Sequence, residues 1–118
     1  MATKDEINTF LRDFHVKMNI WGIIFRDDRG KNTQTLLDLE INKDYRNKVL
    51  KTLTDEDYAE GPLPEKMYGG SAMWIFGKLI KRKEIYIKIT MGIAGAQVIC
   101  ISFHIAEHPM QYPHKSSR

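Results

Sequence analysis

Side chains suited to acid–base chemistry recur at every second position of two neighbouring segments near the C-terminus. Tyr86 and Lys88 alternate with isoleucines in EIYIKIT, and Ser102 and His104 alternate with apolar residues in VICISFH. Alternation with a period of two is typical of a half-buried β-strand. We therefore predict a β-hairpin over residues 84–108, with one apolar face and one open face that carries a phenol, an amine and an imidazole.

The same alternation predicts which side chains of the hairpin face the core. These are Ile85, Ile87, Ile89, Met91, Ile99, Ile101 and Phe103. Cys100, the only cysteine, falls on the polar face by this count and has no partner for an internal disulfide. A lone cysteine of this kind is typical of a reducing compartment, so we expect a cytoplasmic protein.

Cleavage of RNA through its own 2′-hydroxyl group uses residue types of this kind. The 2′-oxygen must lose a proton, the leaving 5′-oxygen must gain one, and the charge that develops on the phosphate must be stabilised. His104 suits the role of base or acid, Tyr86 can donate a proton or orient the phosphate, and lysines supply positive charge. The predicted catalytic residues are Tyr86, His104, Lys88 and Lys78. This chemistry needs no metal and no cofactor, and we expect neither.

A third strand, over residues 73–80, precedes the hairpin. If Ile75 and Leu79 face the core, the alternate positions, which include Trp74, face the open side. Aromatic side chains stack on unpaired bases, and basic side chains contact phosphates. The predicted RNA-binding residues are Trp74, Phe76, Tyr68, His108, Lys81 and Arg82.

The distribution of charge also fits an anionic ligand. Residues 1–59 contain 10 Lys or Arg and 11 Asp or Glu, a net charge of −1. Residues 60–118 contain 8 and 4, a net charge of +4, together with His104, His108 and His114. A basic half that contains the hairpin is consistent with binding to nucleic acid.

The length of 118 residues indicates one domain, residues 1–118, in which residues 109–118 form a C-terminal tail. Because the tail contains two prolines, we expect it to pack for a few residues past the last strand and then to fray. No apolar run approaches the ~20 residues of a membrane span, and the polar N-terminus does not resemble a signal peptide.

The sequence pattern in the first half of the chain predicts helices. Residues 3–19 begin with a capping box and carry an apolar stripe, formed by Ile7, Phe10, Leu11, Phe14 and Met18. We predict further helices over residues 33–41 and 42–53, the second with an apolar stripe of Tyr45, Val49, Leu50 and Leu53. We also predict a short strand over residues 20–26, before these two helices, and a long loop over residues 59–72, after them.

Helices followed by antiparallel strands define an α+β domain. We expect the N-terminal helices to pack on one face of a C-terminal antiparallel β-meander and to leave the opposite face open.

Two other functions fit parts of the sequence. The first is a non-catalytic domain that binds RNA or a protein through the same basic face. The second is a zinc hydrolase, because residues 104–108 match the pattern His-x-x-Glu-His. That chemistry needs both histidines on one helix, whereas His104 ends a predicted strand and Pro109 follows His108 directly.

The block from EIYIKIT to VICISFH resembles the C-terminal hairpin of the MqsR family of bacterial toxins. LLDLEI, a helix and then LTDEDY follow the same order as in that family, and Trp74 lies about where the family has a Trp. The resemblance covers roughly residues 32–104. It implies a RelE-like fold, cleavage of messenger RNA, and neutralisation by a cognate antitoxin that carries zinc-binding and helix-turn-helix parts.

Position by position, the resemblance places the family's catalytic tyrosine on Tyr86 and the lysine two residues later on Lys88. The family's functional lysine after Ser-Phe falls on His104, which changes the acid–base properties of that position. A family glutamine is replaced by Ile75, and a loop lysine falls near Glu60. The C-terminal extension EHPMQYPHK lies beyond the family's usual end.

Overall fold

The computed structural model describes residues 1–27, 30–67 and 70–116. Its helices are α1 (Lys4–Trp21), α2 (Lys31–Leu39) and α3 (Lys43–Lys51), with a 3₁₀ turn, η1, at Asp55–Asp57. Its strands are β1 (Ile23–Phe25), β2 (Tyr58–Leu63), β3 (Met73–Ile80), β4 (Lys83–Thr90) and β5 (Val98–Ile105). None of the helices in these ranges has both the length and the apolar character needed to cross a membrane.

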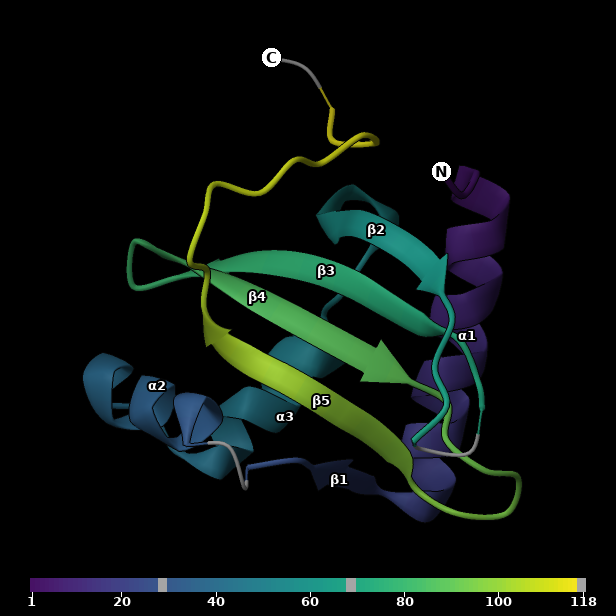
Figure 1. The fold of residues 1–118 in the computed structure, drawn as a ribbon, viewed down its shortest axis with the longest axis horizontal. Coiled ribbons are helices and arrows are strands. Elements are labelled where there is room, and N and C mark those ends of the chain that lie inside the picture. The colour runs from purple at the N-terminus through teal and green to yellow at the C-terminus, as the bar shows by residue number, and fades with distance from the viewer. Residues whose placement is uncertain (28–29, 68–69, 117–118) are drawn as a thin grey trace.

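The strands form one sheet in the order β1-β5-β4-β3-β2 (Figure 1). β1 runs parallel to β5, and the other neighbours are antiparallel. Figure 1 shows α1 and α3 behind the sheet and α2 beside β5. The protein is therefore an α+β domain with an N-terminal helix and a mostly antiparallel sheet, as predicted. Of the two outer strands, β1 lies within the strand predicted over residues 20–26, although its place in the sheet was not predicted, and β2 was not predicted as a strand.

α1 forms because its first turn is capped and its apolar residues recur at helical spacing. The Thr3 hydroxyl accepts a hydrogen bond from the Glu6 backbone N–H (3.2 Å), and the Glu6 carboxylate accepts one from the Thr3 N–H (2.9 Å). All five residues of the predicted stripe are buried in the core. At about 2 kcal/mol for each buried side chain, this stripe holds α1 to one face of the sheet.

The segment predicted as a long loop, residues 59–72, begins with a strand. β2 pairs antiparallel with β3, with an irregular register on both sides of Glu60. Its Gly61–Pro62 peptide bond is cis. Proline cannot donate to a sheet ladder, but edge strands and bulges tolerate it. The loop prediction was wrong because Gly and Pro, which mark turns in a sequence, also fit an irregular edge strand.

A bulge in β5 moves part of the strand to the other face. The pairing with β4 shifts between Lys88 and Ile89, which leaves Ile101 as the extra residue. Cys100 therefore lies in the core, where burial raises the pKa of its thiol. Ile101, predicted to share the core face with Phe103, lines the open side instead. Both predictions failed because a bulge interrupts the period of two.

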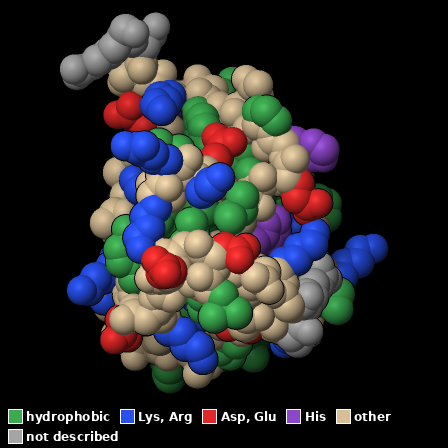
Figure 2. Space-filling model, turned by 90° about the vertical axis from the view of Figure 1, so that its left-hand side faces the viewer, with side chains coloured by type: hydrophobic (Ala, Val, Ile, Leu, Met, Phe, Trp, Pro, Cys, Tyr) green, Lys and Arg blue, Asp and Glu red, His purple; other side chains and the backbone are tan. Residues whose placement is uncertain are grey.

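The turn between β3 and β4 consists of Lys81 and Arg82, both with left-handed backbone conformations (φ of 49° and 69°). Figure 2 views the molecule from the left-hand side of Figure 1, where this turn lies, and shows basic side chains interspersed with acidic ones. Two-residue hairpins of this type favour Asn-Gly, because residues with a Cβ are strained at positive φ.

Replacing Arg82 by glycine is expected to stabilise the protein by about 0.5–1 kcal/mol, because glycine relieves this strain. The melting temperature, followed by circular dichroism, should rise by roughly 2–6 °C. Arg82→Ala removes the same charge but keeps a Cβ, so its melting temperature should stay near that of the wild type. Equal melting temperatures for the two variants would show that the turn is not strained.

The C-terminal strap, residues 106–116, leaves β5 and crosses one end of the sheet. The Tyr112 hydroxyl donates to the Glu84 carboxylate (2.7 Å), and His114 Nε2 donates to the Ala2 carbonyl (2.8 Å). The prediction that the tail frays is therefore wrong for the described residues, which are hydrogen-bonded to the body of the protein.

Candidate functional site

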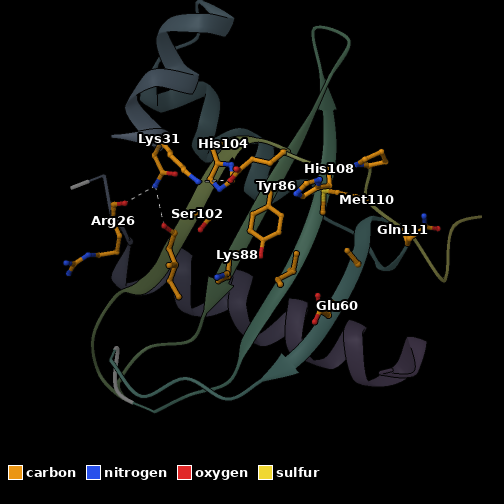
Figure 3. A pocket seen from close by; sticks show the side chains of 16 residues that line it. Arg26, Lys31, Glu60, Tyr86, Lys88, Ser102, His104, His108, Met110 and Gln111 are labelled. Atoms are coloured by element: carbon orange, nitrogen blue, oxygen red, sulfur yellow. Dashed lines mark hydrogen bonds and ion pairs between the residues drawn. The ribbon is translucent and has the colours of Figure 1, made fainter. Parts of the chain in front are cut away.

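A pocket of about 600 Å³ opens on the face of the sheet that α1 leaves free (Figure 3). Its floor is built by side chains of β3, β4 and β5, which are Ile75, Tyr86, Lys88, Ser102 and His104. Its rim is formed by the start of α2, by β2 and by the C-terminal strap. The hairpin residues predicted to share an open face therefore lie together in one pocket.

Tyr86 lies at the centre of the pocket floor. It is paired with His104 across β4 and β5, and the two rings stack with centroids 5.2 Å apart and planes 16° apart. Lys88 lies two residues further along β4, with Nζ 5.8 Å from the Tyr86 ring centroid. Figure 3 shows the Tyr86 ring between His104 and Lys88. The phenol, the imidazole and the amine can thus reach the same ligand.

The hydrogen bonds of the site fix where its protons lie. His104 Nδ1 is 3.0 Å from the Ile105 carbonyl oxygen, which can only accept, so Nδ1 carries a proton. In the neutral ring, Nε2 is then left with a lone pair. Burial raises the pKa of Tyr86, and the nearby Glu60 carboxylate raises it further. The phenol therefore keeps its proton at neutral pH and is available as a donor.

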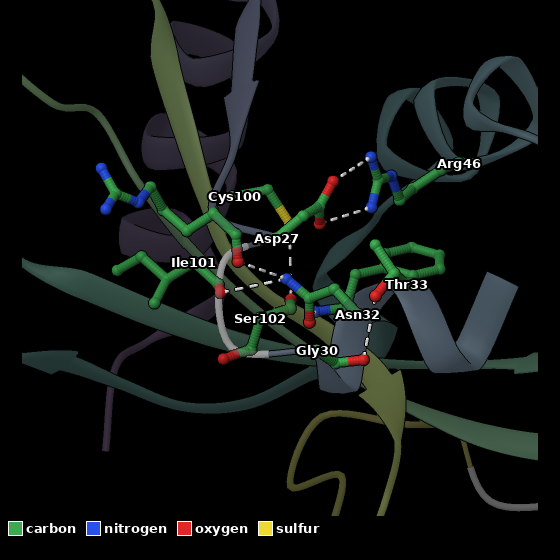
Figure 4. Close-up of polar contacts among 10 residues, drawn as sticks. Asp27, Gly30, Asn32, Thr33, Arg46, Cys100, Ile101 and Ser102 are labelled. Carbon is green, nitrogen blue, oxygen red and sulfur yellow. Dashed lines mark hydrogen bonds and ion pairs between the residues drawn. The ribbon is translucent and has the colours of Figure 1, made fainter.

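Two side chains of α2 hold the part of β5 that lines the pocket. Asn32 Nδ2 donates to the Ile101 carbonyl (3.3 Å; Figure 4), and Asn32 Oδ1 accepts from the Phe103 N–H (2.9 Å). Thr35 Oγ1 accepts from the Ile105 N–H (3.1 Å). Since β1 has ended before this point, these bonds satisfy ladder groups that would otherwise lack a strand neighbour. The fold thus positions the pocket floor through α2.

The charged residues on the rim are unevenly distributed. Lys31 Nζ lies 2.6 Å from Glu107 Oε1 and so joins α2 to the strap. This lysine lowers the pKa of Glu107. Arg26 lies at the same end of the pocket, whereas Glu60 of β2 lies at the other end (Figure 3). Cationic groups therefore gather on the α2 side.

Three predicted site residues of β3 lie on the opposite face of the sheet. Trp74 and Phe76 are 8% and 0% exposed and stack on Phe10 of α1, with ring centroids 4.6 and 6.3 Å apart. Lys78 Nζ pairs with Asp57 Oδ2 at 2.9 Å. The face assigned to β3 was wrong because this strand is apolar on both sides, so its sequence shows no clear alternation. These three residues do not line the pocket.

The other predicted RNA-binding residues are divided. His108, in the strap, lines the pocket. Lys81 and Arg82 are exposed at the β3–β4 turn, and Lys81 Nζ donates to the Leu39 carbonyl (2.7 Å). Tyr68 lies outside the described residues.

The segment from His104 to His108 lacks the helix that a zinc hydrolase of this pattern needs. β5 continues through Ile105, and Glu107 is paired with Lys31. In the part of the chain that the structure describes, no group of three His, Cys, Asp or Glu side chains could hold a metal ion. The zinc alternative therefore finds no site among these residues.

Several pocket residues were not predicted from the sequence. Arg26 directly follows a short apolar strand, and Lys31 begins a helix. Neither belongs to a repeat or motif shared with the hairpin. Only the parallel pairing of β1 with β5 brings this end of the chain to the pocket. No local signal indicated that pairing.

Comparison with known proteins found no family model that matches the chain, no match among curated proteins, and no match among solved structures. The structure therefore shows an α+β domain with a pocket on the open face of its sheet, lined by a phenol, an imidazole and an amine among other groups.

Proposed function

We propose that the protein is an endoribonuclease that cleaves single-stranded messenger RNA by general acid–base catalysis through the 2′-hydroxyl group of the substrate. The convergence of Tyr86, Lys88 and His104 in one pocket carries this proposal. A phenol that keeps its proton, an imidazole nitrogen with a lone pair and an ammonium group are the three functions that the reaction requires.

The proton positions assign the roles. His104 Nε2 removes the proton of the 2′-hydroxyl, and the 2′-oxygen attacks the adjacent phosphorus. The bond from phosphorus to the 5′-oxygen breaks, and the Tyr86 phenol protonates that oxygen. Lys88 stabilises the negative charge on the phosphate oxygens during the transfer. The products are a 2′,3′-cyclic phosphate and a 5′-hydroxyl end.

The resemblance to MqsR toxins supports the same reading and extends it to a partner. The proposal therefore includes a RelE-like toxin fold, supported by the central antiparallel meander, and a cognate antitoxin that neutralises the toxin. Ile75 and Glu60, where the resemblance lacks the family's polar residues, both line the pocket. The two positions at which this sequence differs from the family therefore lie in the pocket, where they affect which RNA sequence the pocket accepts.

Wild-type protein in the presence of EDTA is expected to cut a single-stranded RNA oligonucleotide but not its all-2′-deoxy counterpart. The reason is that the attacking oxygen is absent from the second substrate, whereas the phosphates that favour binding remain. Gel electrophoresis of end-labelled oligonucleotides measures the cleavage, and fluorescence anisotropy measures the binding of both.

Cleavage of the deoxy oligonucleotide, or cleavage that EDTA abolishes, would contradict the 2′-hydroxyl mechanism. If both oligonucleotides are bound and neither is cut, the non-catalytic RNA-binding alternative is correct.

A further inference from the structure

The C-terminal strap is fixed to the open face by hydrogen bonds to Glu84 and by close packing on Gly77. The Glu84 carboxylate accepts from the Met110 N–H (3.0 Å) and from the Tyr112 hydroxyl (2.7 Å), so one side chain holds the strap at two points. A Cβ added at Gly77 would overlap the Tyr112 hydroxyl oxygen. Tyr112 therefore lies directly on the backbone of β3, in space that only glycine leaves open.

The strap lies between the pocket and the β3–β4 turn. Along β4 the chain passes from Lys83 at the turn, through Glu84 beneath the strap, to Tyr86 in the pocket. Residues 107–111 of the strap form the wall of the pocket on this side. A strand of RNA on the open face is therefore blocked from running along β4 to the turn. The path that stays open from the pocket runs across the strands, between the α2 side and β2.

The charges at the two ends of that path differ. The α2 side presents Arg26 and Lys31, whereas the β2 side presents the Glu60 carboxylate. A guanidinium group matches a phosphate with two parallel hydrogen bonds, and a carboxylate repels it. The phosphate next to the pocket is therefore favoured at the α2 end.

We infer that the strap directs the RNA of the proposed function across the sheet, with a flanking phosphate bound by Arg26. The basic turn at Lys81 and Arg82 lies outside the path of the RNA. This inference rests on the proposed function. It replaces the RNA-binding role that the sequence predicted for the turn.

Arg26→Ala and Arg82→Ala form a matched pair that tests the path, because each removes one arginine on opposite sides of the strap. The probe is a single-stranded 2′-O-methyl oligonucleotide of about six nucleotides, which is within the range of single-strand sites and cannot be cleaved through the 2′-oxygen. Binding is measured by fluorescence anisotropy at several salt concentrations. Arg26→Ala should reduce the slope of log Kd against log salt by about 0.7, the value for one phosphate contact, and Arg82→Ala should leave it unchanged.

Arg26→Lys keeps the positive charge and should restore most of the slope. Circular dichroism verifies that each variant is folded. A reduced slope for Arg82→Ala, or an unchanged slope for Arg26→Ala, would overturn the path while leaving the nuclease proposal in place. Failure of the wild-type protein both to bind this probe and to cut RNA would overturn the proposed function and the path together.

Release of the strap provides a second test. Gly77→Ala puts a methyl group where Tyr112 lies, so the ring must leave its position. The turn then becomes accessible from the pocket, and Arg82→Ala in the Gly77→Ala background should now reduce the salt slope. No change in this double variant would show that the strap does not separate the turn from the RNA.

Discussion

Replacing His104 by alanine is expected to lower the rate of RNA cleavage about 10²- to 10⁴-fold, while RNA affinity changes little. The imidazole removes a proton from the 2′-hydroxyl in the proposed reaction, and alanine provides no base. Nδ1 is occupied by the Ile105 carbonyl, so only Nε2 is available for this step. Single-turnover kinetics with saturating protein separates the rate of cleavage from binding.

Circular dichroism of His104→Ala distinguishes a lost base from a damaged fold, and bacterial growth provides a further readout. Expression of the wild-type chain in bacteria should arrest growth, and His104→Ala should relieve the arrest. Unchanged cleavage by a folded His104→Ala protein would remove His104 from the mechanism.

A second histidine provides the matched control. His15 of α1 donates from Nε2 to the Leu50 carbonyl (2.9 Å) and does not line the pocket. Glutamine can preserve that hydrogen bond through its amide, so His15→Gln should cleave RNA at close to the wild-type rate. A large loss in this variant would indicate that cleavage responds to stability and not to the site.

The sequence predicted the part of the pocket floor that β4 and β5 form, because strand geometry is local. Residues two apart in a strand project to the same side, so Tyr86 and Lys88 had to share a face, and Ser102 and His104 likewise. The bulge lies between Ser102 and Cys100. The predicted faces of Ser102 and His104 are therefore correct, whereas the predicted face of Cys100 is wrong.

The rest of the site depends on contacts between segments far apart in the chain. The pocket acquires its α2 end from the pairing of β1 with β5, and its wall from the strap. Local periodicity carries no information about either contact. The prediction of which face of β3 is open failed for a related reason. Different parts of the protein cover the two faces of this strand, and both faces therefore carry apolar residues.

In helix α3, the sequence of one turn also failed to predict which side chains are buried. The predicted apolar stripe included Tyr45, but Tyr45 is 41% exposed and its neighbour Arg46 is completely buried. Arg46 forms two hydrogen bonds to the Asp27 carboxylate, at 2.9 and 3.1 Å (Figure 4). Its guanidinium carbon lies 3.5 Å from the centroid of the Phe25 ring. Both partners come from the end of β1, so the sequence of the helix alone could not indicate the burial.

Arg46→Met is expected to destabilise the protein by about 3 kcal/mol. Methionine can keep the packing on Phe25, but it leaves the Asp27 carboxylate without its ionic partner, and removing one member of a buried pair typically costs roughly 3–5 kcal/mol. The lower end of that range applies because the Asp27 side chain is 22% exposed and retains some contact with water. Urea denaturation followed by circular dichroism measures the free energy of unfolding. Lys48→Met, on the exposed side of the same helix, should change it by less than about 0.5 kcal/mol.

The double variant Arg46→Met/Asp27→Leu identifies the origin of the loss. If the unpaired carboxylate causes it, removing that carboxylate should recover about 1–3 kcal/mol, so the double variant is more stable than Arg46→Met alone. Arg46 Nε has no hydrogen-bond partner in the described part of the chain, so the native pair is itself incompletely satisfied and an apolar replacement loses little. If the double variant is instead no more stable than Arg46→Met, the unpaired carboxylate is not the cause of the loss. Because Asp27 follows Arg26 directly, either result also shows how firmly α3 holds the cationic end of the pocket.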